Sequence, residues 1–143
     1  MTPPPIAGRS RDVVAATFVL VGTVFLPWAE SGSVSRSGWS IVGSARRLGV
    51  VDSTFGELFA VGFFVLPIFA FAALTMFALD RPRLVAAASG LAVVATVVVA
   101  AAVIRSSLGP RWGLWLNVAT ACVDGFLTIR LWRSSPISRV LEE

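Results

Sequence analysis

The sequence predicts an all-α, polytopic membrane protein whose four transmembrane helices form two antiparallel hairpins. The first observation is that four apolar stretches fill most of the 143 residues. A helix needs about 20 apolar residues to cross a hydrocarbon core about 30 Å thick, and three of the stretches reach that length. The second observation is composition. Hydrophobic residues make up 56% of the chain and charged residues 14%, which leaves too little polar surface for a water-soluble domain of this size.

The third observation is that two of the three connections are very short. Residues 80–83 and 105–111 contain proline and charged residues, and each stretch is long enough only for a tight turn between neighbouring helices. The helices are therefore expected at about 13–29, 55–79, 83–105 and 112–132, within one transmembrane domain over 13–132. Residues 1–12 and 133–143 are expected to be terminal tails, the first of them flexible and rich in proline.

The first apolar stretch could also be a signal peptide, because Arg9 and Arg11 precede it. A cleavage site after Ala29 would place Pro27 and Trp28 in front of the cut, where small residues are preferred. We therefore expect a retained helix that ends at Pro27, with Trp28 at the membrane interface.

The expected extracytoplasmic loop, 30–54, is the longest connection. Its alternating serines suit a strand or a coil, and 40–48 has the spacing of a short amphipathic helix. Thr54 and Glu57 then match a capping box at the start of the second span. The loop is either a connector lying on the membrane surface or a docking surface. In the second case the residues in contact with lipid or a partner are Arg36, Trp39, Arg46 and Arg47.

Two motifs in this first half resemble a largely uncharacterised type of small actinobacterial membrane protein. They are Leu26-Pro27-Trp28 at the end of the first helix and Arg36-Ser37-Gly38-Trp39 in the loop, which continues to Ala45-Arg46-Arg47-Leu48-Gly49. The resemblance implies four helices and an actinobacterial lineage, and it implies no activity.

The middle spans carry features of helix packing. Pro67 is expected to kink the second helix, because proline removes one backbone hydrogen bond. In the third helix, Ala86 and Gly90, and Ala92, Thr96 and Ala100, are four residues apart, a spacing that lets helices approach closely. The third helix is therefore expected inside the bundle.

Asp124 is the one charge expected in the middle of a span, where a carboxylate costs roughly 2.5–3.5 kcal/mol. Asn117, Thr120, Asp124 and Thr128 fall close to one helix face and form a polar stripe, which is the candidate site. Asp124 could carry protons or cations, could be a structural group bonded to neighbouring hydroxyls, or could pair with a basic residue of another subunit.

Missing residue types exclude several chemistries. The chain has no histidine and no lysine, so a bis-histidine haem, a histidine base and a lysine Schiff base are excluded. The single cysteine, Cys122, excludes thiol oxidoreductases that need cysteine pairs. The acids are scattered, which disfavours a metal site or a membrane enzyme. No catalytic residue, metal or other cofactor is expected, and arginines at segment ends indicate headgroups rather than nucleic acid.

Arginine counts favour cytoplasmic termini in a bacterial plasma membrane, with seven arginines on the side of the termini and five on the other. The expected function is that of a non-enzymatic accessory or scaffold subunit of a larger inner-membrane complex, in envelope transport, export or respiration. Its partners would be the bilayer and either other membrane subunits or copies of itself. The alternative is a small proton-coupled secondary transporter, acting as an oligomer through Asp124.

Overall fold

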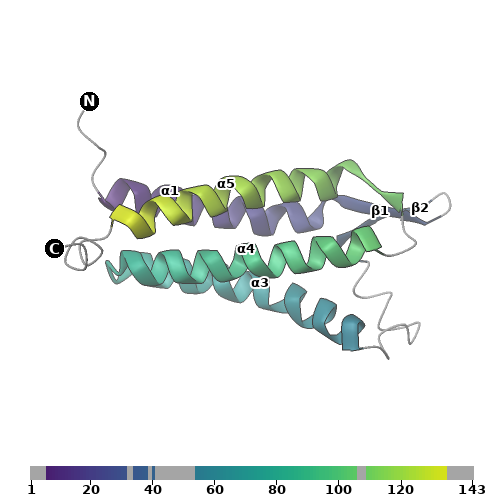
Figure 1. The fold of residues 1–143 in the computed structure, drawn as a ribbon, viewed down its shortest axis with the longest axis horizontal. Coiled ribbons are helices and arrows are strands. Elements are labelled where there is room, and N and C mark those ends of the chain that lie inside the picture. Colours follow the sequence, from purple (N-terminus) through teal and green to yellow (C-terminus); the bar gives the residue numbers. More distant parts are fainter. Residues whose placement is uncertain (1–5, 32–33, 39, 41–53, 106–108, 135–143) are drawn as a thin grey trace.

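The chain folds into four long helices packed side by side, with a small β-sheet at one end (Figure 1). The computed structural model describes residues 6–31, 34–38, 40, 54–105 and 109–134. The helices are α1 (Ile6–Gly22), α3 (Thr54–Ala78), α4 (Pro82–Arg105) and α5 (Trp112–Ser134). The start of α1, the end of α5 and the turn between α3 and α4 lie at one end, which we call the terminal end, and the sheet lies at the other.

The helix-rich fold agrees with the sequence, but the described residues do not support four membrane spans. Two helices of the described chain are long and apolar enough to cross a membrane, over Pro82–Ile104 and Trp112–Ser134. In α3 the described apolar segment is shorter, Phe64–Ala78. In α1 the early Arg9, Arg11 and Asp12 interrupt the apolar character.

The first helix differs from the expected 13–29. It begins at Ile6, directly after Pro5, so residues 6–12 of the expected flexible tail are helical. It ends at Gly22 and continues as a 3₁₀ turn, η1 (Thr23–Phe25). Leu26 then adopts an extended conformation with a ψ of 161°, because a residue that precedes proline avoids the helical region.

The next residues form a sheet that the all-α expectation did not include. Strand β1 (Pro27–Ser31) lies between β2 (Val34–Ser37) and β3 (Gly109–Pro110), antiparallel to both. The register of β1 and β2 shifts between Pro27 and Ala29, which leaves Trp28 as the additional residue of a bulge. The sheet joins the end of α1 to the start of α5.

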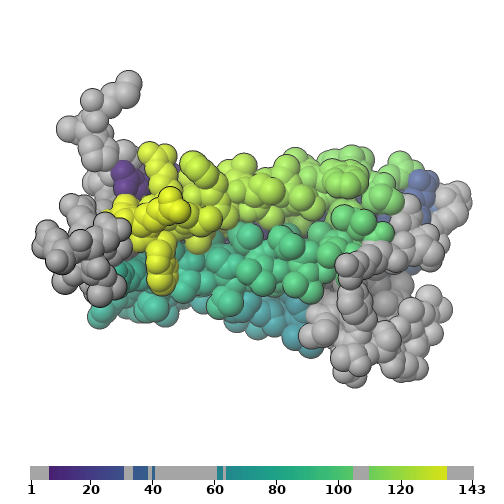
Figure 2. Space-filling view, in the orientation of Figure 1, coloured from purple at the N-terminus to yellow at the C-terminus, as the bar shows by residue number. Residues whose placement is uncertain are grey.

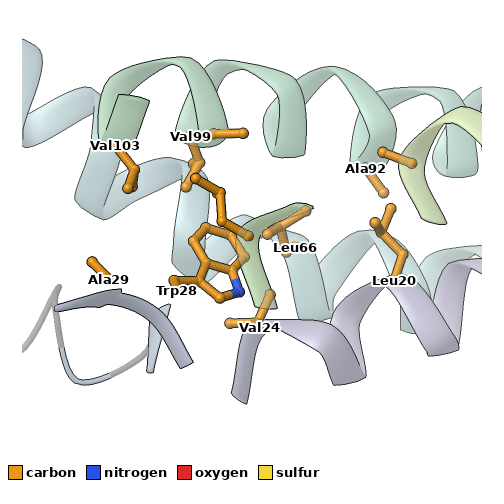
Figure 3. Close-up of a cluster of buried hydrophobic side chains, with 11 residues drawn as sticks. Leu20, Val24, Trp28, Ala29, Leu66, Ala92, Val99 and Val103 are labelled. Carbon is orange, nitrogen blue, oxygen red and sulfur yellow. The ribbon is translucent and has the colours of Figure 1, made fainter. Parts of the chain in front are cut away.

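Trp28 is a core residue and not the interfacial anchor expected from the sequence. Its side chain is fully buried, and the indole Nε1 donates a hydrogen bond to the carbonyl oxygen of Thr23 at 2.9 Å. Figure 3 shows the ring among Val24, Leu66 and Val99. The bulge accounts for the difference, since it turns this side chain into the bundle while the backbone stays in the sheet.

The start of α5 lies directly against β1. The backbone N–H of Arg111 donates to the carbonyl oxygen of Trp28 at 2.8 Å, and the Arg111 side chain pairs with Glu30. A Cβ atom at Gly113 would lie 2.9 Å from the Cβ of Leu26 and closer still to the carbonyl oxygen of Pro27. Gly113 is therefore required for this close approach.

The turn between α3 and α4 closes in three residues. The N–H of Arg81 donates to the Met76 carbonyl at 2.9 Å and the N–H of Asp80 to the Phe77 carbonyl at 3.0 Å, a Schellman motif. Asp80 takes the left-handed conformation that this motif needs, with φ at 51°. Pro82 then begins α4, where its missing N–H costs nothing. The two helices thus form the tight antiparallel hairpin that the sequence predicted.

Two apolar clusters fill the interior of the bundle. The cluster nearer the sheet contains Leu20, Val24, Trp28, Ala29, Leu66, Ala92, Val99, Ala100, Val103, Leu114 and Ala121. The cluster nearer the terminal end contains Val13, Val14, Ala73, Val85, Ala86 and Leu131. Helix α4 contributes to both and packs against the other three helices, with its small residues Ala86, Ala92 and Ala100 buried.

Some expectations lie outside the described residues. They are the amphipathic helix beyond residue 40, the side chains of Trp39, Arg46 and Arg47, the side chains of the 54–57 cap, and the tail after residue 134. Pro67 does lie inside α3, and Figure 1 shows the N-terminal part of α3 diverging from α4.

Candidate functional site

A layer of polar side chains separates the two apolar clusters. It contains Thr17 of α1, Ser89 of α4, and Asp124 and Thr128 of α5, which we call the hydroxyl–carboxyl cluster. Along each helix these residues lie between members of the two clusters, so the layer crosses the bundle about halfway along its length. Asp124 is fully buried there, and within the described residues no arginine pairs with it.

Three hydroxyl groups surround the Asp124 carboxyl group. Ser89 Oγ lies 2.8 Å from Oδ1, and Thr17 Oγ1 lies 3.1 Å from Oδ2. Thr17 Oγ1 is also 2.7 Å from Ser89 Oγ and 2.9 Å from the carbonyl oxygen of Val13. Thr128 Oγ1 lies 3.0 Å from Ser89 Oγ. Each of the three helices therefore supplies a group that holds the carboxyl in place.

The three hydroxyl groups have too few hydrogens to form a hydrogen bond at every one of these contacts. A hydroxyl group has one hydrogen to donate, so three hydroxyls can fill at most three of the five close oxygen contacts described above. A neutral Asp124 supplies a fourth hydrogen. Its O–H can donate to Thr17, Thr17 to Ser89 and Ser89 back to Oδ1, which closes a ring of hydrogen bonds. The cluster thus has room for one proton on Asp124.

The structure changes the composition of the predicted stripe. Asn117, Asp124 and Thr128 are buried, whereas Thr120 is only half-buried and donates its hydroxyl hydrogen to the carbonyl of Leu116 at 2.8 Å. The buried face of α5 runs through Ala121 instead, because the alternating spacing of four and three residues keeps 117, 121, 124 and 128 in line.

Asn117 belongs to a separate polar contact nearer the sheet. Its Nδ2 donates to Thr23 Oγ1 at 2.6 Å and lies 3.3 Å from the Leu20 carbonyl oxygen. These bonds hold α5 against the point where α1 changes into η1. Within the described residues, Asn117 Oδ1 and Thr96 Oγ1 are buried without a partner.

The spacing of polar residues along α5 does not identify Thr17 and Ser89, the two residues that contact the carboxyl from other helices. Ser89 had a usable signal, because Ala86, Ser89, Thr96 and Ala100 recur at helical spacing along one face. No signal in the sequence points to Thr17, since a single threonine in an apolar run can lie on any face of the helix.

The candidate loop site is described only at Arg36, which is half-buried in β2. Glu30 lies in the neighbouring strand β1 and pairs with Arg111, which directly follows β3; their side chains are 37% and 42% exposed, respectively. Such exposed pairs contribute little stability. Among the described residues there is no group of three acids or cysteines that could hold a metal ion.

Comparisons of the chain with protein-family models, with curated proteins and with solved structures find no match.

Proposed function

We propose that this protein is an integral protein of the bacterial plasma membrane, with all four helices in the bilayer, and that it acts as a non-enzymatic accessory or scaffold subunit of a larger membrane complex. The observation that carries the membrane part is the distribution of polarity in the described residues. Apart from Asp124, the charged groups lie toward the two ends of the bundle, and exposed apolar side chains cover the helices between them.

The outer surface of the bundle is apolar on every helix. Large apolar residues on the outside are between 52% and 65% exposed. They include Val19 and Phe25 of α1 and η1, Ile68 and Phe71 of α3, Leu91, Val94 and Val97 of α4, and Val123, Phe126 and Ile129 of α5. Water-soluble monomers rarely expose an apolar surface of this extent, whereas lipid chains solvate it.

Aromatic and charged residues border this surface. Trp112 and Trp115 are exposed at the sheet end of α5, and Trp132 is exposed at its other end, as in the aromatic belts of membrane proteins. The apolar part of the first segment, from Val13 to Phe25, spans only about 20 Å. Local thinning of the bilayer would accommodate it.

The orientation follows from the arginines. The sequence places seven arginines on the side of the termini and five on the other. Of the described ones, Arg9, Arg11, Arg81, Arg83, Arg130 and Arg133 lie at or near the terminal end, and Arg36, Arg105 and Arg111 at or near the sheet end. The positive-inside rule then puts the terminal end in the cytoplasm and the sheet outside.

The accessory role is supported by the way Asp124 is enclosed. Hydroxyl groups from three helices and apolar side chains on both sides surround it, which favours a structural group over a site open to a substrate. A basic residue of another subunit has no access to a carboxyl group buried in this way. The chain contains no histidine and no lysine, and this supports a non-enzymatic role.

Labelling of Cys122 tests the membrane placement. Its side chain is exposed in the structure, in the middle of α5. In native membranes we expect a water-soluble maleimide to leave it unlabelled, because lipid surrounds it, and to label it after unfolding in SDS. Rapid labelling in intact membranes would show that this face meets water and would contradict the proposal.

Two matched variants provide controls and report the orientation. In a Cys122→Ser background, Ser35→Cys places a thiol on the exposed part of β2 and Asp80→Cys places one in the exposed turn. An impermeant maleimide added to spheroplasts should label the first variant only, and permeabilisation should expose the second. The reverse pattern would overturn the orientation while leaving the membrane placement intact.

Co-purification tests the accessory role. We expect the tagged protein, extracted from its native membrane in mild detergent, to bring a stoichiometric membrane protein with it in quantitative mass spectrometry. An unrelated four-span protein expressed at the same level is the control. A homogeneous assembly of this chain alone would contradict the accessory role.

Such an assembly would favour the second candidate, a small proton-coupled transporter working as an oligomer. One observation supports that candidate, namely the room for a proton in the hydroxyl–carboxyl cluster. Substitutions of Asp124 distinguish the accessory subunit from the transporter.

A further inference from the structure

A groove with three arginines lies where the start of α1 meets the end of α5. Its volume is about 420 Å³, and it is lined by Arg9, Phe126, Ile129, Arg130, Arg133 and Ser134. Figure 2 shows the last turns of α5, in yellow, beside the first residues of α1, in purple. The lining residues of α5 follow a helical spacing of three and four, so the groove runs along one face of that helix.

The groove carries an excess of positive charge. Asp12 lines a smaller adjoining pocket together with Arg9 and Arg130, and it is the one acid among the described residues that line the two pockets. Arg9 and Arg130 line both pockets, so guanidinium groups outnumber the Asp12 carboxylate among the described lining residues. The first turn of α1, which contains no acidic residue, adds the partial positive charge of a helix N-terminus.

Arg9 indicates that an acceptor is missing. Its Nε atom is buried and has no hydrogen-bond partner among the described residues. A buried donor normally finds an acceptor, so a ligand with anionic oxygens would complete the contacts of this side chain.

The rest of the groove is apolar and open. Phe126 lies about one turn before Arg130 along α5 and Ile129 about one turn before Arg133, and the two apolar residues are 65% and 55% exposed. A ligand that fits the whole groove therefore has an anionic head and a hydrocarbon part that continues along the surface of α5.

We propose that this groove binds one anionic glycerophospholipid, with its phosphate between Arg9 and Arg130 and an acyl chain over Phe126 and Ile129. The inference rests on the proposed membrane placement, and it identifies a lipid of the leaflet at which α1 begins and α5 ends. Free phosphate shares the chemistry of the head but leaves the apolar part of the groove empty.

Native mass spectrometry of the detergent-purified full chain tests this proposal. Phosphatidylglycerol and phosphatidylcholine with identical acyl chains are titrated separately. We expect phosphatidylglycerol to bind more tightly, and Arg9→Gln and Arg130→Gln each to weaken its binding about fivefold, the usual effect of one arginine near an anionic head. Arg83→Gln, at the same end but outside the groove, is the matched control and should leave binding unchanged.

The outcomes separate the possible sources of the anion. Equal binding of the two lipids overturns the proposal. So does an equal loss of phosphatidylglycerol binding in all three variants. Displacement of the lipid by millimolar inorganic phosphate, with the same dependence on Arg9 and Arg130, shows that free phosphate is the ligand and also overturns it. Failure of the membrane placement is distinguishable, because the protein would then fail to enter nanodiscs of any lipid composition.

Discussion

Replacing Trp28 with alanine is expected to lower the free energy of unfolding by about 3–5 kcal/mol, the range for removal of a large aromatic side chain from a well-packed core. The indole is fully buried among residues of three helices, and its loss leaves a cavity where η1, α3 and α4 meet. It also removes the hydrogen bond to the Thr23 carbonyl. The measurement is SDS-induced unfolding in mixed micelles, followed by circular dichroism.

Two further substitutions show whether the burial of this ring is responsible for the expected loss of stability. Trp28→Phe keeps most of the apolar volume and loses the hydrogen bond, so its cost should be nearer about 1–2 kcal/mol. Trp115→Ala removes the same residue type from the exposed face of α5, where 55% of the side chain is accessible, and should cost less than about 1 kcal/mol. Equal losses for Trp28→Ala and Trp115→Ala would mean that Trp28 is not a core residue.

Replacing Asp124 with alanine is expected to cost about 2–4 kcal/mol, because the hydroxyls of Ser89 and Thr17 lose a buried acceptor. Asp124→Asn should cost less than about 1 kcal/mol. The amide oxygen can accept from Ser89, the amide N–H can donate to Thr17, and the Thr17 hydroxyl can then donate to Val13. Thermal unfolding in detergent, followed by tryptophan fluorescence, measures both variants.

The asparagine variant also distinguishes the two candidate functions, because an amide cannot release a proton at physiological pH. An accessory subunit with this substitution should still bind its partner and support the partner's activity. A transporter should lose proton-coupled uptake while it remains folded. Asp80→Asn, at an exposed position in the turn, is the control for an effect of charge alone. A strongly destabilised Asp124→Asn protein would contradict the hydrogen-bond ring with a neutral carboxyl group.

The second to fourth helices begin and end close to the expected residues, because their boundaries depend on local chemistry. Pro82 at the start of α4 and the short turn after Ala78 leave few other positions at which α3 can end and α4 can begin. The first helix was misplaced at both ends for a different reason. Hydropathy marks apolar residues and not helical ones, so it missed the charged first turns of α1 and continued the helix into an apolar strand. The strand pairs on one edge with β2 and on the other with β3, which is distant in sequence.

The candidate site was predictable along one helix and not across helices. Periodicity identified Asn117, Asp124 and Thr128, and it included Thr120 because a residue three positions from Asn117 lies as close to the face as one four positions away. The partners Thr17 and Ser89 depend on how α1, α4 and α5 rotate against one another. That rotation follows from the apolar clusters on both sides of the polar layer, which no single segment encodes.

The central position of β1 has a consequence for the order of events during synthesis. Its pairing with β2 joins segments that are neighbours in sequence, so this hairpin can form before the rest of the sheet. Its other edge pairs with β3, which is synthesised only after α3 and α4. That edge stays open until α3 and α4 have been synthesised, and it closes when the start of α5 arrives. Closure of the sheet then marks the point in biogenesis at which the first and last helices are fixed to each other.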